Sequence, residues 1–172
     1  MLTRRFFSVF ITLSAICVKP AMAGWLGIWG GISPPLVEKF DSSHQGVALD
    51  IEFTVKKKCA YTFNIDFLHR DKQWNELKDL LRGGEAKKGI ILPVHLTIEK
   101  PDSKEGEYVF DEVVETCGAT AHSSSSTERT VGHSNLDPGK YRAILKMSQY
   151  TPELSGIETN FVIRVRPKTN CP

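Results

Sequence analysis

The sequence has no apolar run long enough to hold the protein permanently in a bilayer. Its longest such run extends from Phe6 to Val18, which is 13 residues, whereas a membrane-crossing helix needs about 20 apolar residues. We therefore expect that the mature protein is not an integral membrane protein.

An excess of charge of one sign is also missing. The chain has 22 basic and 20 acidic residues, and without Arg4, Arg5 and Lys19 of its first 23 residues it has 19 and 20. A protein that binds nucleic acid or an anionic lipid surface generally carries a basic face. The near-neutral balance argues against both kinds of partner, and we expect no nucleic-acid partner.

The usual signatures of a cofactor or catalytic site do not occur. There is no glycine-rich phosphate loop and no dinucleotide-binding fingerprint, and the four cysteines include no closely spaced pair that would suit zinc. The stretch Gly132-His133-Ser134-Asn135-Leu136 lacks the second glycine of a nucleophile elbow, so we interpret it as a loop. We expect no cofactor, no catalytic residues and no enzymatic activity.

Two histidines are weak candidates for a metal site. His122 and His133 flank the serine-rich stretch 123–126, and they would meet only if that stretch folded back. Two surface histidines are the simpler interpretation. Metal-assisted hydrolysis by this pair is the enzyme alternative.

The sequence begins with the pattern of a signal peptide. Arg4 and Arg5 precede the apolar run, and Ala21-Met22-Ala23 follows it as a cleavage site. We predict that residues 1–23 are removed after Ala23 and that the mature protein is periplasmic or secreted. The paired arginines leave export in a folded state open, whereas lipidation of Cys17 is disfavoured because a bulky isoleucine precedes it.

Residues 24–34 form a segment that is rich in glycine and tryptophan and has no charge. The composition favours no regular element there. Trp25 and Trp29 either pack over the neighbouring domain or offer a surface to a partner, and we prefer the first alternative.

The remaining residues, 35–172, predict one domain built mainly from strands. Apolar and polar residues alternate over 49–55 and again over 61–67, so we expect two half-buried strands that pair as a hairpin. Further strands are expected over 94–98, 108–116, 141–147 and 157–165, and a helix over about 71–82 with Asp71 as its N-cap. Such a series folds most simply as an antiparallel sandwich of two sheets.

The turn before Tyr141 has the strongest local signature. Pro138 and Gly139 place Tyr141 at the start of a strand, which looks like the tyrosine corner of immunoglobulin-like sandwiches, where the ring is buried and its hydroxyl bonds back to the turn. We therefore expect a mostly β, immunoglobulin-like antiparallel β-sandwich with one short inserted helix.

Three cysteines remain after the leader, and an oxidising compartment makes one disulfide plausible. Cys59 and Cys117 each lie at an expected strand end, so a bond between them is our first choice. A bond from Cys171 that fastens the tail is the alternative. The odd number leaves one thiol that is free or pairs with a second chain, and the oligomeric state stays open.

Several short motifs follow one another in an order that resembles an exported proteobacterial family of unknown function. They are Leu80-Leu81-Arg82-Gly83-Gly84, the strand from Ile91 to Ile98, Arg129-Thr130-Val131-Gly132, the turn from Leu136 to Tyr141, and the stretch from Pro152 to Ile157. The resemblance covers the chain from about Pro35 to Val165. It implies an immunoglobulin-like sandwich in the bacterial envelope and carries no catalytic residues to transfer.

These observations favour a noncatalytic periplasmic module that binds another protein or assists the cell envelope. Sandwich scaffolds commonly offer loops and edge strands to partners, so the surface would include Trp25 and Trp29, the serine-rich loop, or both. An inhibitor that protects the cell from a toxin of competing bacteria is a more specific alternative. The metal-assisted hydrolase is the contrasting class.

Overall fold

The computed structural model of the protein describes residues 34–69, 77, 79–84, 87–102, 107–169 and 171. The expected leader, Trp25 and Trp29, and the expected N-cap Asp71 lie outside these residues. No helix in the described ranges combines the length and the apolar composition that crossing a bilayer requires.

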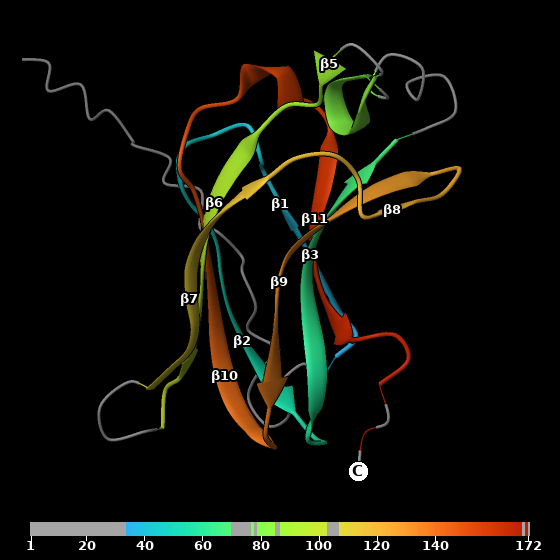
Figure 1. The fold of residues 1–172 in the computed structure, drawn as a ribbon. Coiled ribbons are helices and arrows are strands. Elements are labelled where there is room, and N and C mark those ends of the chain that lie inside the picture. The colour runs from blue at the N-terminus through green and yellow to red at the C-terminus, as the bar shows by residue number, and fades with distance from the viewer. Residues whose placement is uncertain are drawn as a thin grey trace, which may run out of the picture.

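Two antiparallel sheets pack face to face (Figure 1). One has five strands in the order β1-β11-β3-β9-β8, the other has four in the order β2-β10-β6-β7, and β4 and β5 form a separate two-stranded ribbon. The bounds are β1 Leu36–Phe40, β2 Gly46–Val55, β3 Cys59–Leu68, β4 Gly83–Gly84, β5 Lys87–Lys88, β6 Leu92–Lys100, β7 Glu107–Thr116, β8 Ala121–His122, β9 Ser126–Leu136, β10 Gly139–Met147, a short 3-10 helix Pro152–Leu154, and β11 Glu158–Val165. The expected mostly β sandwich is confirmed.

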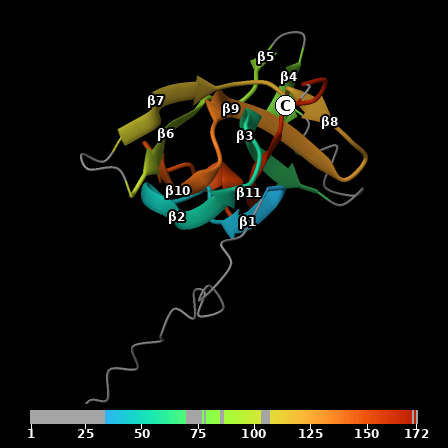
Figure 2. The same ribbon diagram turned by 90° about the horizontal axis from the view of Figure 1, so that it is seen from below.

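The core lies between the sheets because alternate residues of each strand point inward. On β3, Phe63, Ile65 and Phe67 have no exposed surface, and Leu96 and Ile98 of β6 meet them from the other sheet. Seen along the strands, β7 and β9 lie side by side at one edge of the sandwich (Figure 2). There the ring of Phe110 packs on Phe63 with a centroid distance of 5.7 Å.

The expected hairpin between 49–55 and 61–67 is wrong. β2 pairs with β10 in the four-stranded sheet, and β3 pairs with β11 and β9 in the five-stranded sheet. The connection 56–58 therefore crosses from one sheet to the other. Alternation shows which side chains face the core, but two strands can face the same core from one sheet or from opposite sheets.

Two expected loops also contain strands. The stretch Gly132-His133-Ser134-Asn135-Leu136 belongs to β9, and the serine-rich stretch is flanked by β8 and β9, which pair with each other. Strand β1 was not expected at all. The expected helix is present where the chain is described, with residues 77 and 79–82 helical and Leu81 fully buried.

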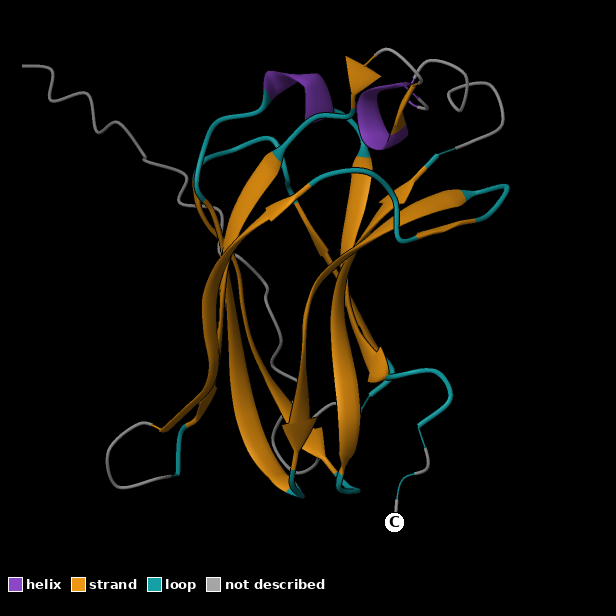
Figure 3. Ribbon diagram, viewed as in Figure 1, coloured by secondary structure: helices purple, strands orange, loops and turns teal. Residues whose placement is uncertain are grey.

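The antiparallel order divides the connections between two ends of the sandwich (Figure 3). At one end, which we call the loop end, the strands are joined through the connections 41–45, 69–91, 117–125 and 148–157, of which 70–76, 78 and 85–86 are not described. At the opposite end, which we call the stapled end, they are joined through 56–58, 101–106 and 137–138, of which 103–106 are not described. The three longest connections therefore begin and end at one end of the sandwich, the arrangement in which sandwich domains commonly carry binding residues.

Candidate functional site

The stapled end is fastened by two tyrosines in equivalent positions. The hydroxyl of Tyr141 donates to the carbonyl of Asp137 at 2.8 Å, and that of Tyr61 donates to the carbonyl of Lys57 at 3.0 Å. Both rings are buried, and burial raises the pKa of both hydroxyls. Each connection that crosses between the sheets at this end thus has a tyrosine corner, and Lys58 pairs with Asp137 at 2.9 Å to link the two.

The disulfide also belongs to the stapled end. Cys59 bonds Cys171, with 4.9 Å between the Cα atoms, so the alternative pairing is present and the preferred pairing with Cys117 is wrong. Cys59 begins β3 at the stapled end, whereas Cys117 follows β7 at the loop end. A strand of ten residues separates these ends by about 33 Å, far beyond the reach of a disulfide. Cys117 is a free, exposed thiol.

The two histidine candidates do not converge. His122 lies opposite Thr127 at the start of β9, and His133 lies opposite Thr62 farther along the same strand. Six residues of strand place them about 20 Å apart, too far to share a metal ion. Instead, the His122 ring stacks on that of buried His69 at 5.8 Å. Among the described residues, no group of three or more His, Cys, Asp or Glu side chains lies close enough together to hold a metal ion.

A buried arginine anchors the largest connection of the loop end. Arg129 is 1% exposed, and its guanidinium donates to the carbonyls of Ile90, Thr116 and Leu81 at 2.9, 3.3 and 2.5 Å. It also lies over the ring of Phe67. Burial lowers its pKa to about 10. Arg129 thereby ties the helix and the start of β6 to the end of β7.

A second polar cluster lies on the outer face of the five-stranded sheet. Asn160, Asp66 and Glu128 lie opposite one another on β11, β3 and β9, and Arg164 donates to Glu128 at 2.6 Å. Burial raises the pKa of both carboxyls, and the charge of Asp66 raises that of Glu128 further. Within the described part of the chain, Asp66 Oδ1 and Asn160 Oδ1 are enclosed without a hydrogen-bond partner. Because these atoms are covered, we assign the cluster to the fold.

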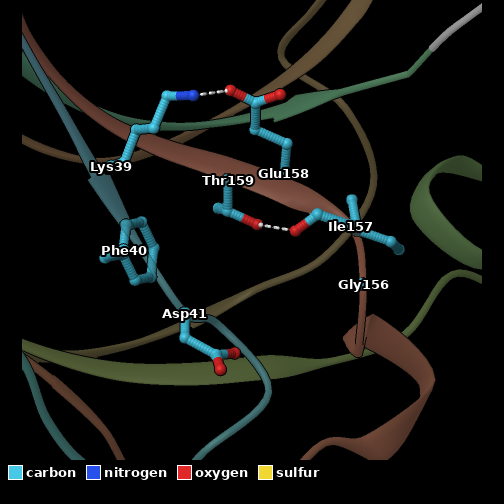
Figure 4. Close-up of a pocket in the computed structure, with 7 residues that line it drawn as sticks. All are labelled: Lys39, Phe40, Asp41, Gly156, Ile157, Glu158 and Thr159. Atoms are coloured by element: carbon cyan, nitrogen blue, oxygen red, sulfur yellow. Dashed lines mark hydrogen bonds and ion pairs between the residues drawn. The ribbon is translucent and has the colours of Figure 1, made fainter.

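An open pocket lies where β1 ends and β11 begins, at the loop end (Figure 4). Its volume is about 370 Å³. The ring of Phe40 and the side chain of Ile157 form apolar walls, and the carboxylates of Asp41 and Glu158 lie at opposite ends. Lys39 pairs with Glu158 at the mouth. The remaining lining residues are Gly156 and Thr159.

The connection 41–45 holds one of these carboxylates in place. Asp41 Oδ1 accepts hydrogen bonds from the amide and the hydroxyl of Ser43 at 2.9 and 2.6 Å, and Asp41 Oδ2 lies 2.8 Å from His44 Nδ1. The hydrogen bonds from Ser43 lower the pKa of Asp41, and the hydrogen bond and charge interaction with His44 lower it further. Asp41 is therefore ionised at neutral pH.

Asp41, His44 and Ser43 do not form a hydrolytic triad. Such a triad needs the carboxylate on one ring nitrogen and the serine on the other. Here both Asp41 and Ser43 approach Nδ1 of His44, at 2.8 and 3.0 Å, and the Ser43 hydroxyl is buried. The group caps a turn and is not arranged for nucleophilic attack.

The connection 148–157 packs against the same turn. The amide of Thr151 donates to the carbonyl of Ser43 at 2.8 Å, and Gln45 donates to the carbonyl of Ser148 at 3.0 Å. Tyr150 is 62% exposed with its ring 6.1 Å from that of His44. The pocket thus lies beside a fixed pair of loops that present an exposed aromatic residue.

Sequence reasoning missed both Arg129 and the pocket. For Arg129 a signal was available, because it alternates with the apolar Val131 and occupies an inward position. The pocket had no such signal, because its two walls come from strands that are more than 100 residues apart, with the pair Phe40 and Thr159 in register.

Comparison with solved structures supports the fold. The chain is similar to the crystal structure of a protein from Sulfurospirillum deleyianum, with a TM-score of 0.64 and 17% identity over 77% of this chain and 98% of that chain. None of the curated proteins is significantly similar to the present chain. The family described as a domain of unknown function, DUF5625, matches residues 38–165. Because this match covers more than half of the chain, the chain belongs to the DUF5625 family.

Proposed function

We propose that the protein is an exported, noncatalytic binding domain of the bacterial envelope, and that its loop end contacts another protein. The observation that carries this proposal is the unequal division of the connections. The stapled end is fastened by two tyrosine corners and a disulfide, whereas the loop end has the three longest connections, an open pocket and the exposed ring of Tyr150.

The compartment in the proposal is supported by two features. The first 23 residues have the layout of a cleavable leader, and a disulfide between Cys59 and Cys171 is the kind of bond that persists in an oxidising environment. Sequencing the amino terminus of the protein recovered from the periplasm or medium tests this part. A mature chain that begins at Gly24 is expected, and a full-length chain in the cytosol would contradict it.

Binding at the loop end is tested by photo-crosslinking in the producing cells. A photoreactive phenylalanine analogue replaces Tyr150 or Ser124 at the loop end, and Lys57 or Lys168 at the stapled end, all of which are exposed. We expect crosslinks to a discrete protein from the first pair only. Crosslinks of equal yield from both pairs, or none from either, would remove the proposal.

A further inference from the structure

We propose that the pocket between Asp41 and Glu158 receives a basic side chain, arginine or lysine, of the protein partner. This inference rests on the proposed function, because it names the chemistry of one contact that the partner makes. It concerns the residues at the ends of β1 and β11 that Figure 4 shows.

The charge of the lining selects a cation. Among the lining residues, Asp41 and Glu158 carry carboxylates, and Lys39 carries the ammonium group that pairs with Glu158. The lining therefore carries one negative charge in excess. Asp41 keeps its charge because its Oδ1 accepts two hydrogen bonds from Ser43 and its Oδ2 lies beside Nδ1 of His44, and a carboxylate oxygen can accept more than one such bond.

The shape of the lining selects a cation on an aliphatic stem. The ring of Phe40 and the side chain of Ile157 lie between the two carboxylates (Figure 4). Lysine and arginine bury their methylene groups on apolar surfaces while the charged head stays hydrated or paired. An arginine head gains further by contact with an aromatic face. A bare metal ion would contact only the carboxylates and would make no use of the apolar part of the lining.

Lys39 already shows the expected mode of binding within the chain. Its ammonium group pairs with Glu158 across the mouth, and both side chains are substantially exposed. Exposed ion pairs are weak, so a basic side chain of the partner can replace Lys39 on Glu158. Loss of Lys39 should therefore strengthen binding of a cation.

The test is a titration of the purified, leader-free protein followed by amide signals in the NMR spectrum. The probe is Nα-acetyl-arginine amide, and the matched control is the citrulline derivative, which has the same shape without charge. We expect the arginine probe alone to shift the signals of 39–41 and 156–159. Equal shifts with citrulline, or no shift at these residues, would overturn the proposal.

Three variants sharpen the result. Asp41→Asn and Glu158→Gln should each weaken binding of the arginine probe by about two- to fivefold, and Lys39→Met should strengthen it by a similar factor. Because Asp41→Asn also touches the turn at Ser43, Glu158→Gln keeps the test decisive if that turn loosens. Unchanged affinity in Glu158→Gln together with weaker binding in Lys39→Met would overturn the proposal.

Failure of this inference can be told apart from failure of the proposed function. If the photoreactive analogue at position 150 still crosslinks the partner with unchanged yield in the double variant D41N/E158Q, the pocket proposal is wrong and the binding function stands. If the arginine probe binds as expected but no crosslink forms at the loop end, the pocket chemistry is supported and the proposed function fails.

Discussion

At the residue scale, one unfavourable feature is the enclosed carboxylate of Asp66. Its Oδ1 atom has no hydrogen-bond partner within the described residues, and burial raises its pKa above the ordinary value of 3.8. A raised pKa means that the folded state holds the proton more tightly than the unfolded state. The stability linked to this proton is therefore present below pH 3.8 and is lost as the pH rises through the raised folded value.

We predict that Asp66→Asn stabilises the protein at pH 7 to 8 and has little effect near pH 3.5. The amide has no charge to desolvate, so the difference between the variant and the natural protein should grow as the pH rises. Urea unfolding at a series of pH values measures it. Asp50→Asn is the control, and its effect on stability should have the opposite sign. Arg142 donates a hydrogen bond to Asp50, and this bond lowers the pKa of the Asp50 carboxyl. A constant difference at every pH would contradict the prediction.

At Gly132, a single neighbouring side chain occupies the space that any residue larger than glycine would need. A Cβ atom at this position would collide with the ring of Phe110, which fills the seam between β7 and β9. We predict that Gly132→Ala lowers the free energy of unfolding by about 1–2 kcal/mol, because the ring must move from its contact with Phe63.

Gly139→Ala is the matched control for this prediction. A Cβ atom at Gly139 would meet Lys100 at 3.5 Å, which is an ordinary contact, so a change below about 0.5 kcal/mol is expected. Thermal unfolding of both variants measures the difference. Equal melting temperatures would show that the Phe110 ring is free to move away.

At the scale of elements, the helix and its neighbouring ribbon depend on Arg129. The residues between β3 and β6 contribute Leu81 to the core, and Arg129 binds the carbonyls of Leu81 and Ile90 on either side of the ribbon. The amide of Ile90 also donates to the carbonyl of Leu80 at 2.7 Å. Among the described residues of the insertion, these contacts attach its carboxyl-terminal half to the sheet.

We predict that Arg129→Met destabilises the protein by about 2–3 kcal/mol, because buried carbonyl groups lose their donor. The loss should be local as well as global. Hydrogen exchange at Ile90 should accelerate more than exchange at the centre of β3. Arg142→Met is the control, since Arg142 makes its ion pairs with Asp50 and Glu99 at the surface, and such pairs contribute below about 1 kcal/mol. Equal losses in the two variants would count against a special role of Arg129.

At the scale of the whole molecule, a disulfide fastens one end of the sandwich, and the three longest connections join strands at the other end. The Cys59–Cys171 bond spans a sequence separation of 112 residues at the stapled end. A bond that closes so long a loop restricts the unfolded chain strongly. The exposed thiol of Cys117 has no such effect.

We predict that the double variant C59S/C171S loses about 3–5 kcal/mol of stability. Denaturant unfolding under nonreducing conditions measures the loss, and the natural protein with a reductant should behave like the variant. Cys117→Ser is the control and should leave stability within about 0.5 kcal/mol. A variant as stable as the natural protein would mean that the bond restricts little of the unfolded chain.

The local patterns of the sequence determined most of the strands outside β1, β8 and β9, their inward faces and the tyrosine corner at Tyr141. Alternation from 49 to 55 and from 61 to 67 depends only on the two-residue period of a strand, and a Pro-Gly turn depends only on neighbouring residues. These features could be predicted because their causes lie within a few residues of each other. The order of the short motifs along the chain indicated the family, because it can be read from the sequence without knowing how the strands pair.

Tertiary structure alone decided which sheet each strand joins, which cysteines bond and where the pocket lies. β2 and β3 separate into different sheets, Cys59 meets Cys171 from the other end of the chain, and Phe40 lies opposite Thr159. Each of these results depends on pairing between residues distant in sequence, where an alternating pattern fits several partners equally well. The folded sandwich selects among them because one arrangement covers all of the inward faces at once.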